Sequence, residues 1–138
     1  MIQAGTCISY LVECQNGVHA ADDVYMAALY SPQADLGPET TRYVSAGEVV
    51  GDGYVAGGKA LTGRVCKALA DGSGSYLTFA DPTWDTSSIS ARGVLIYNKS
   101  KGGRAVMIGD FGRDFTSSNA PFVAHLPPEG CVIIKAAQ

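Results

Sequence analysis

Short apolar runs alternate with glycine- and proline-containing turns along most of the chain. The turn signals recur roughly every 8–12 residues, a spacing typical of sandwiches and barrels rather than of βαβ units. The pattern therefore predicts an all-β fold: an antiparallel β-sandwich or jelly-roll-like fold in a single domain over residues 1–138. The exception is the start of the chain, where we expect an N-terminal arm and helix over about residues 1–17.

The helix is indicated by apolar residues at the spacing of one helix face. Thr6 belongs to a residue type that caps helix N-termini, and Asn16-Gly17 is a typical helix end. We expect one short helix over about residues 7–15, with Thr6 as its N-cap. The three apolar residues at this spacing are Ile8, Leu11 and Val12.

A first core strand is expected over residues 24–30, which are apolar at both sets of alternating positions and lie between polar turns. Residues 31–42 contain two prolines and predict a loop, and residues 51–58 predict a glycine-dense surface segment. The other expected elements are a strand over 59–66, a turn over 71–74, a strand over 75–79 and a final strand over 131–135.

The clearest hairpin is expected between Ile89 and Ile108, with strands over 93–97 and 104–108 and a glycine-rich turn between them. At strand period, four apolar residues are expected to share its buried face. Asp110-Phe111-Gly112 then predicts a strand end and a turn. The four residues expected to share a face are Val94, Ile96, Val106 and Ile108.

Composition predicts a packed protein with few charges. Hydrophobic residues make up 46% of the 138 residues, enough for a core, and charged residues make up 17%, against roughly 25% in typical soluble domains. A low charge fraction is also expected where a partner covers part of the surface. The net charge is −3, and the densest cations, Lys99, Lys101 and Arg104, predict a solvated hairpin tip rather than a nucleic-acid site.

The first residues lack the positive and apolar regions of a signal peptide, and no stretch reaches the roughly 18 apolar residues of a membrane span. We therefore expect a soluble protein made in a cytoplasm, with neither membrane nor nucleic acid as a partner.

Four cysteines, Cys7, Cys14, Cys66 and Cys131, are spread along the chain. None forms a closely spaced Cys/His pair of the kind that zinc sites use, so no metal site is expected. Two alternatives remain: buried free thiols that behave as small hydrophobes, or disulfides, including bonds between subunits formed in an oxidising medium.

No set of residues predicts catalysis or cofactor binding. Gly51-x-Gly53-x-x-Ala56 resembles a dinucleotide fingerprint but lacks the preceding strand and following helix that the chemistry needs. Asp22-Asp23 lacks the spacing of a calcium loop. His125 is expected to pack at a strand end, and His19 in the turn that follows the helix. We expect neither an enzyme nor a cofactor; a cysteine–histidine hydrolase is the weakest alternative.

One combination of motifs resembles a family of small virion proteins of tailed bacteriophages, over roughly residues 10–126. The cysteines are not part of this resemblance. Its motifs are Leu11-Val12-Glu13, Gly17-Val18-His19, residues 24–31, Thr40-Thr41-Arg42-Tyr43, Glu48-Val49-x-Gly51-x-Gly53-Tyr54-x-Ala56-Gly57-Gly58-x-Ala60-Leu61-Thr62, Phe79-Ala80-Asp81-x-x-Trp84, Ser88-Ile89-x-Ala91-Arg92-Gly93-x-Leu95-Ile96-Tyr97-Asn98 and Arg104-Ala105-Val106-x-x-x-Asp110-Phe111-Gly112.

The resemblance implies a structural component of the phage particle. Its first implied role is a capsid decoration (cement) protein on the capsid exterior. Its partners would be the major capsid protein and other copies of itself, most naturally as a trimer. The alternative is a head-fibre, neck or tail-associated protein. Contact elements expected for decoration are the 51–58 segment, the 31–42 loop and the N-terminal arm, which are expected to be flexible.

Overall fold

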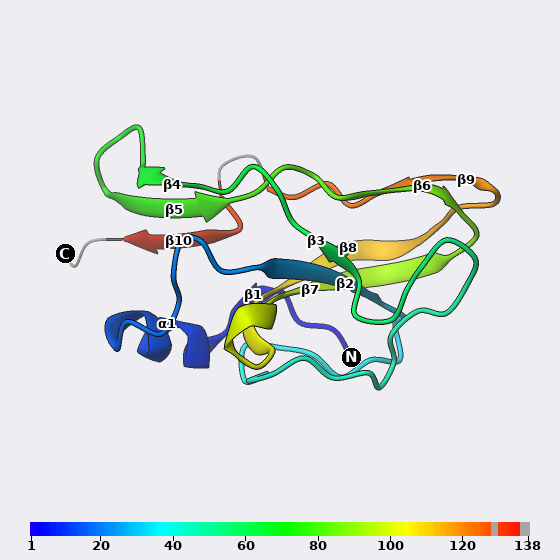
Figure 1. Ribbon diagram of the computed structural model, residues 1–138, viewed down its shortest axis with the longest axis horizontal. Helices are drawn as coiled ribbons and strands as arrows, with labels where there is room; N and C mark the ends of the chain where they lie inside the picture. Colours follow the sequence, from blue (N-terminus) through cyan, green and yellow to red (C-terminus); the bar gives the residue numbers. More distant parts are fainter. Residues whose placement is uncertain (128–129, 136–138) are drawn as a thin grey trace.

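The structure, a computed structural model, describes residues 1–127 and 130–135 (Figure 1). It confirms the predicted all-β fold with antiparallel sheets and one short helix. No helix among the described residues is long and apolar enough to cross a membrane. The elements are β1 (Gly5–Thr6), α1 (Ile8–Gln15), β2 (Tyr25–Tyr30), β3 (Lys59–Ala60), β4 (Val65–Ala68), β5 (Gly74–Thr78), β6 (Thr83–Ser87), β7 (Ser90–Asn98), the 3₁₀ turn η1 (Lys99–Lys101), β8 (Arg104–Thr116), β9 (Ala120–Val123) and β10 (Val132–Lys135).

The strands form two layers. A central sheet has the order β1-β8-β7-β2-β3, and a second layer contains two smaller sheets, β10-β5-β4 and β6-β9. Figure 1 shows this second layer above the central sheet, with α1 and the long β2–β3 connection below it. The central sheet is therefore covered on both faces, and its middle strands β2 and β7 are almost entirely buried.

Burial on both faces explains why β2 is apolar throughout. The prediction that four apolar residues of the hairpin share one buried face is wrong. Leu95 pairs with Ile108, so these two side chains lie on the same face, opposite to Val94 and Ile96. The register then shifts between Ile96 and Tyr97. When both faces are buried, apolar residues occupy every position and no longer indicate which face each one takes.

The predicted strand over 59–66 is wrong: the structure has two short strands, β3 and β4, separated by residues 61–64. β3 pairs with β2 in the central sheet, whereas β4 pairs with β5 in the second layer. The chain changes layer between them, and Gly63 makes the turn with a φ of +64°. The first hairpin strand, the 75–79 strand and the last strand lie within a few residues of their predicted positions, whereas β8 begins at Arg104 as predicted but continues to Thr116.

Helix α1 lies where it was predicted, but Thr6 is not its N-cap. Thr6 pairs with Met107 as part of β1, which leaves Cys7 at the cap position without a side-chain hydrogen bond. The helix is anchored by Tyr10 and partly by Leu11. Two residues of the predicted apolar face, Ile8 and Val12, are 60% and 54% exposed.

Two parts of the sheet structure did not follow from the sequence pattern. The β6–β9 pair was not predicted, because β6 is largely polar and β9 contains Pro121. Asp110-Phe111-Gly112 is not a strand end, as β8 continues to Thr116. Gly112 has a φ of +85°, so the turn signal there marks an irregularity within a long strand.

Candidate functional site

The outer half of β8 and strand β9 enclose an open recess of about 600 Å³, which we name the aromatic groove. It lies between the central sheet and the second layer. Five of its eight lining residues are apolar and three are polar, and ligand sites commonly combine the two kinds of side chain. The aromatic groove is lined by Asp110, Phe111, Phe115, Thr116, Pro121, Phe122, Val123 and His125.

A bulge in β8 shapes one wall of the groove. Ala91 of β7 pairs with Phe115 and Gly93 pairs with Asp110, so residues 111–114 of β8 stand opposite the single residue Arg92. Such bulges bend a strand and change the direction of its side chains. The aromatic side chains of this segment therefore face the recess instead of continuing the sheet's regular alternation.

Asp110 holds the bulge in place. Its Oδ1 accepts hydrogen bonds from the Gly112 backbone N–H and from Arg92 Nε, each at 2.9 Å. Both donors favour the ionised carboxylate, first the backbone N–H and then the guanidinium, and they lower the pKa of Asp110 from its ordinary value. The Asp110 carboxylate is therefore ionised at neutral pH, and the Arg92 guanidinium beside it compensates part of its charge.

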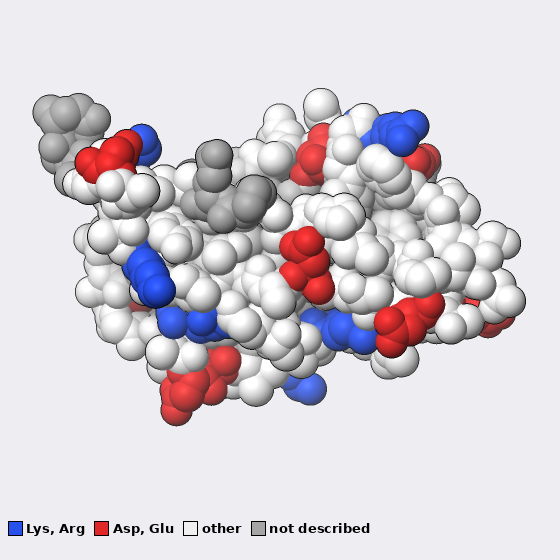
Figure 2. Space-filling model, turned by 90° about the horizontal axis from the view of Figure 1, so that it is seen from above, with Lys and Arg blue, Asp and Glu red and all other residues white. Residues whose placement is uncertain are grey.

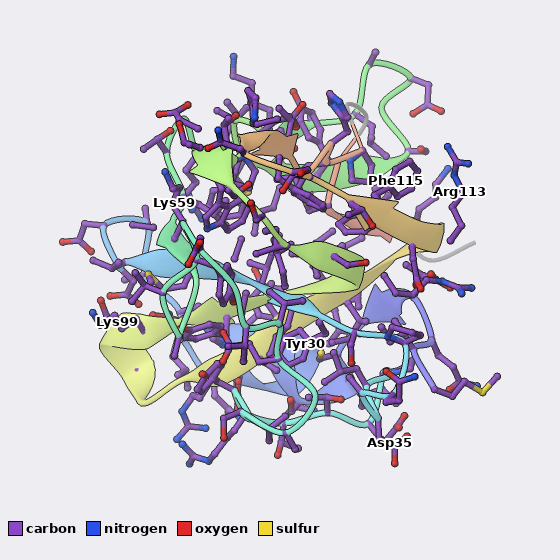
Figure 3. All side chains as sticks on the ribbon, turned by 90° about the vertical axis from the view of Figure 1, so that its right-hand side faces the viewer. Tyr30, Asp35, Lys59, Lys99, Arg113 and Phe115 are labelled. Carbon is purple, nitrogen blue, oxygen red and sulfur yellow. The ribbon has the colours of Figure 1, made fainter. Side chains whose placement is uncertain are left out.

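Three phenylalanine rings form the apolar part of the groove. The ring centroid of Phe111 is 6.2 Å from that of Phe115, nearly edge-on at 84°, and 6.3 Å from that of Phe122. Phe122 is buried, whereas Phe115 is 40% exposed. The Arg113 guanidinium lies 4.6 Å from the Phe115 ring centroid. Figure 3 shows Arg113 and Phe115 together at the edge of the molecule, on the opposite side from Lys59 and Lys99.

His125 lies at one end of the groove and corrects the prediction that it packs at a strand end. Its side chain is 81% exposed, and its Nδ1 is 3.1 Å from Asp81 Oδ2. Asp81 also accepts a 2.8 Å hydrogen bond from the Leu126 backbone N–H. Leu126, rather than His125, is the buried residue of this segment, because side chains alternate across the extended chain.

A second group of polar residues, which we name the Glu48 cluster, holds the β2–β3 connection against the sheet. It consists of Glu48, Tyr43, Tyr54, Gly57 and Tyr97. Glu48 accepts hydrogen bonds from the hydroxyls of Tyr43 and Tyr54 and from the Gly57 N–H, while Tyr97 donates to the Gly57 carbonyl. Burial and the adjacent carboxylate both raise the pKa of Tyr54, so its hydroxyl stays protonated.

A third group joins α1 to the hairpin turn. Asn98, fully buried, donates from Nδ2 to His19 Nδ1 at 2.9 Å and to Asp23 Oδ2 at 2.8 Å. His19 Nδ1 is therefore an acceptor, and the ring donates from Nε2 to Glu13 at 2.9 Å. His19 thus lies in the connection that follows α1, as expected, with its side chain buried in this network.

Two of the three cations predicted to be solvated at the hairpin tip, Lys101 and Arg104, instead form ion pairs, whereas Lys99 is exposed. Lys101 Nζ lies 2.8 Å from Asp23 Oδ2, and Arg104 Nη1 lies 2.7 Å from Glu13 Oε2. These ion pairs join the tip to Glu13 of α1 and to Asp23 in the segment that follows α1. Asp23 was expected to be a weak cation ligand at best. Its carboxylate accepts hydrogen bonds from Lys101, Asn98 and the Ala20 N–H.

All four cysteines are free in the chain. Cys7 and Cys131 are buried, Cys14 is half-buried and Cys66 is exposed on β4. Burial, followed by the nearby charges of Glu39 and Glu13, raises the pKa of Cys7 to about 12. Cys7 and Cys131 therefore lie inside the subunit, as the first of the two alternatives expects, whereas Cys66 is open to solvent.

Each of the two histidines is engaged with one acidic side chain. In residues 1–127 and 130–135, no group of three or more His, Cys, Asp or Glu side chains is placed to hold a metal ion. The hydrogen-bond partners of His19 are Glu13 and Asn98, and that of His125 is Asp81. The structure does not bring Cys66 or the Gly51–Gly53 motif into the aromatic groove.

Sequence reasoning did not find the aromatic groove. One signal was present: Phe111 and Phe115 lie in a segment with three charged residues, beyond the apolar core of the hairpin. The missing information was the position of β9, whose Phe122 is brought beside Phe111 by pairing with β6.

The surface above the second layer is sparsely charged. Figure 2 shows its charged side chains in small separate groups among uncharged atoms. This face does not display the continuous stripe of cations that phosphate backbones require.

No protein-family model, no curated protein and no solved structure matches the chain.

Proposed function

We propose that the chain is a structural component of a tailed-phage particle, acting as a capsid decoration (cement) protein on the outside of the assembled shell. The observation that carries the proposal is the sequence pattern shared with small phage virion proteins. Several residues of that pattern hold the fold together here, including Glu48, Tyr54 and Gly57 of the Glu48 cluster and the Arg92–Asp110 pair.

The β2–β3 connection supports a binding role. Val50 and Val55 are 95% and 74% exposed, yet the segment that carries them is held in place by the Glu48 cluster. Residues 51–58, which were expected to be flexible, are thus joined to Glu48 through Tyr54 and Gly57. Apolar side chains held in one conformation lose little entropy when a partner covers them, which favours binding.

Helix α1 provides a second exposed apolar element. Ile8 and Val12 stand one turn apart and leave the helix on the side that is not packed against the sheet. Decoration of a symmetric shell needs contacts to the major capsid protein and to other copies, most naturally in a trimer. Weak individual contacts then add up over many copies on the shell.

The experiment that tests the proposal is quantitative mass spectrometry of purified phage particles. We expect a copy number within a few-fold of that of the major capsid protein. We also expect the purified protein to bind assembled shells but not free capsid subunits. Absence of the protein from the particles would exclude any structural role.

A fibre, neck or tail-associated protein is the second candidate, and the aromatic groove is the observation that favours it. A recess with an exposed ring suits recognition of a small ligand better than broad contact with a shell. The other aromatic residues that could form a receptor patch do not, because Trp84 is only 3% exposed and Tyr54 is half-buried. A copy number of a few per cent of the capsid protein would favour this role over decoration.

A further inference from the structure

The aromatic groove places an ionised carboxylate beside three aromatic rings. Asp110 Oδ1 is occupied by Arg92 and Gly112, but Oδ2 has no hydrogen-bond partner within the described parts of the chain. Phe111 lies between Phe115 and Phe122, with its ring tilted by more than 50° to both. Rings inclined in this way form the sides of a recess rather than a flat stack.

The chain itself already places a cation on one of these rings. The Arg113 guanidinium lies 4.6 Å from the Phe115 centroid, within the range of a cation–π interaction. The electron-rich face of a phenyl ring attracts positive charge, and here the attraction operates at the rim of the groove. Arg113 is exposed and lies outside the set of lining residues, which leaves the interior of the groove open.

We propose that the aromatic groove binds a methylated ammonium group, whose methyl groups contact the phenylalanine rings while Asp110, which it shares with Arg92, contributes negative charge. A bare ammonium is strongly hydrated and needs hydrogen-bond acceptors that phenyl rings lack. A quaternary ammonium is attracted to ring faces and needs no such acceptors. A neutral apolar group makes no use of the carboxylate.

This inference is independent of the role in a phage particle, since it concerns a ligand site within one chain. The recess of about 600 Å³ is large enough for the ammonium group and a short linked moiety. Val123 and Pro121 on β9 supply an apolar wall opposite the β8 bulge, against which such a moiety would pack.

The test compares choline with 3,3-dimethylbutan-1-ol, which has nearly the same shape and no charge. Each is titrated into the full chain, and backbone amide shifts of residues 110–123 are followed by NMR. We expect saturable shifts with choline and at least about tenfold weaker binding of the neutral alcohol, a difference of about 1.4 kcal/mol. Equal or tighter binding of the alcohol, or no saturable shift with choline, would overturn the proposal.

Variants separate the contributions of charge and ring. Asp110→Asn keeps an oxygen that can accept from Gly112 and Arg92, so it should weaken choline binding about tenfold and binding of the alcohol much less. Phe115→Leu keeps an apolar side chain and removes the ring face, so it should also weaken choline more than the alcohol. Arg113→Ala should strengthen choline binding, because it removes a competing cation. The proposal would be contradicted by weaker choline binding in Arg113→Ala or by unchanged choline binding in Asp110→Asn.

The matched control is Asp35→Asn, which makes the same change of charge at an exposed carboxylate. Figure 3 shows Asp35 far from Arg113 and Phe115, so we expect no effect on choline binding. An equal loss in this variant would assign the attraction to net charge and overturn the site. Phosphocholine then distinguishes two sources of the group: equal binding indicates a phosphocholine headgroup, and weaker binding indicates an ammonium compound without a phosphate.

Discussion

Gly58 illustrates how strongly a single residue can be constrained in this molecule. A side chain at this position would place its Cβ 1.9 Å from the Ala27 carbonyl oxygen, and the backbone φ is +85°. No other residue type fits such an approach without moving β2. The glycine that the sequence shows only as part of a loop is therefore required by the packing of that loop on the sheet.

We predict that Gly58→Ala destabilises the protein by about 3 kcal/mol or more, from the left-handed backbone together with the steric clash. The measurement is the free energy of unfolding by urea, followed by circular dichroism.

The control is Gly72→Ala. Gly72 has a similar φ of +73°, but a Cβ there would meet no atom within 4 Å. Only the backbone cost of about 1–2 kcal/mol should then appear. Equal losses in the two variants would show that the contact with Ala27 is unimportant.

At the scale of elements, α1 and the β7–β8 hairpin are joined by buried or half-buried charges rather than by apolar contacts alone. Glu13, His19, Asn98, Asp23 and Lys101 form one continuous chain of hydrogen bonds between them. Within the described structure, the buried side-chain oxygen Oδ1 of Asn98 accepts no hydrogen bond. The register of α1 on the sheet therefore depends on these groups keeping their charges.

These carboxyl groups predict a loss of stability in acid. Hydrogen bonds from Asn98, Lys101 and the Ala20 N–H lower the pKa of Asp23. Burial opposes ionisation of Glu13, but hydrogen bonds from His19 and Arg104 outweigh the effect of burial, so the pKa of Glu13 is also lowered. As the pH falls toward and below about 4, the ordinary carboxyl pKa, these groups bind more protons in the unfolded chain than in the folded one. Stability should be nearly constant from pH 7 to pH 5, and should fall as the pH drops through the lowered native values.

Urea unfolding between pH 3 and pH 7 measures this dependence. Asp23→Asn should give a shallower decline in acid, since it removes one of the contributing groups. Asp35→Asn, at a carboxylate that is 97% exposed, should leave the slope unchanged. A rise in stability between pH 5 and pH 3 would contradict the assignment of these groups.

For the whole molecule, the position of the cysteines limits how a disulfide could join two copies of the chain. Cys7 and Cys131 are only 0% and 8% exposed, so neither reaches another subunit in this fold. Cys66 is exposed on β4, an edge strand of the second layer. A disulfide between subunits is therefore expected to use Cys66 and to join subunits in pairs rather than in longer ladders.

We predict that the protein, oxidised at high concentration, gives a dimer band on a non-reducing gel that disappears on reduction. Cys66→Ser should abolish this band, and Cys7→Ser should keep it, provided that the variant folds by circular dichroism. A dimer that persists in Cys66→Ser, or a single monomer band in the oxidised wild type, would show that Cys66 does not link subunits.

The sequence by itself determined the fold class, helix α1, the core strand β2 and the β7–β8 hairpin. Each depends on local signals: the period of apolar residues, and the glycines and prolines at the turns. The hairpin strands are joined by a short turn, so their pairing follows from chain continuity. The wrong expectations, such as Thr6 as a cap and a continuous 59–66 strand, occur where a local signal was overruled by pairing with a distant strand.

What depends on the tertiary structure is the layering and, with it, the candidate site. β2 pairs with β7 across more than sixty residues, and β9 reaches Phe111 only because β6 lies beside it. These contacts form because covering both faces of the central sheet buries more apolar surface than any local arrangement. The aromatic groove lies where that covering is incomplete, at the outer edge of β8. Its residues had no pattern in common along the chain, and only folding brings them together.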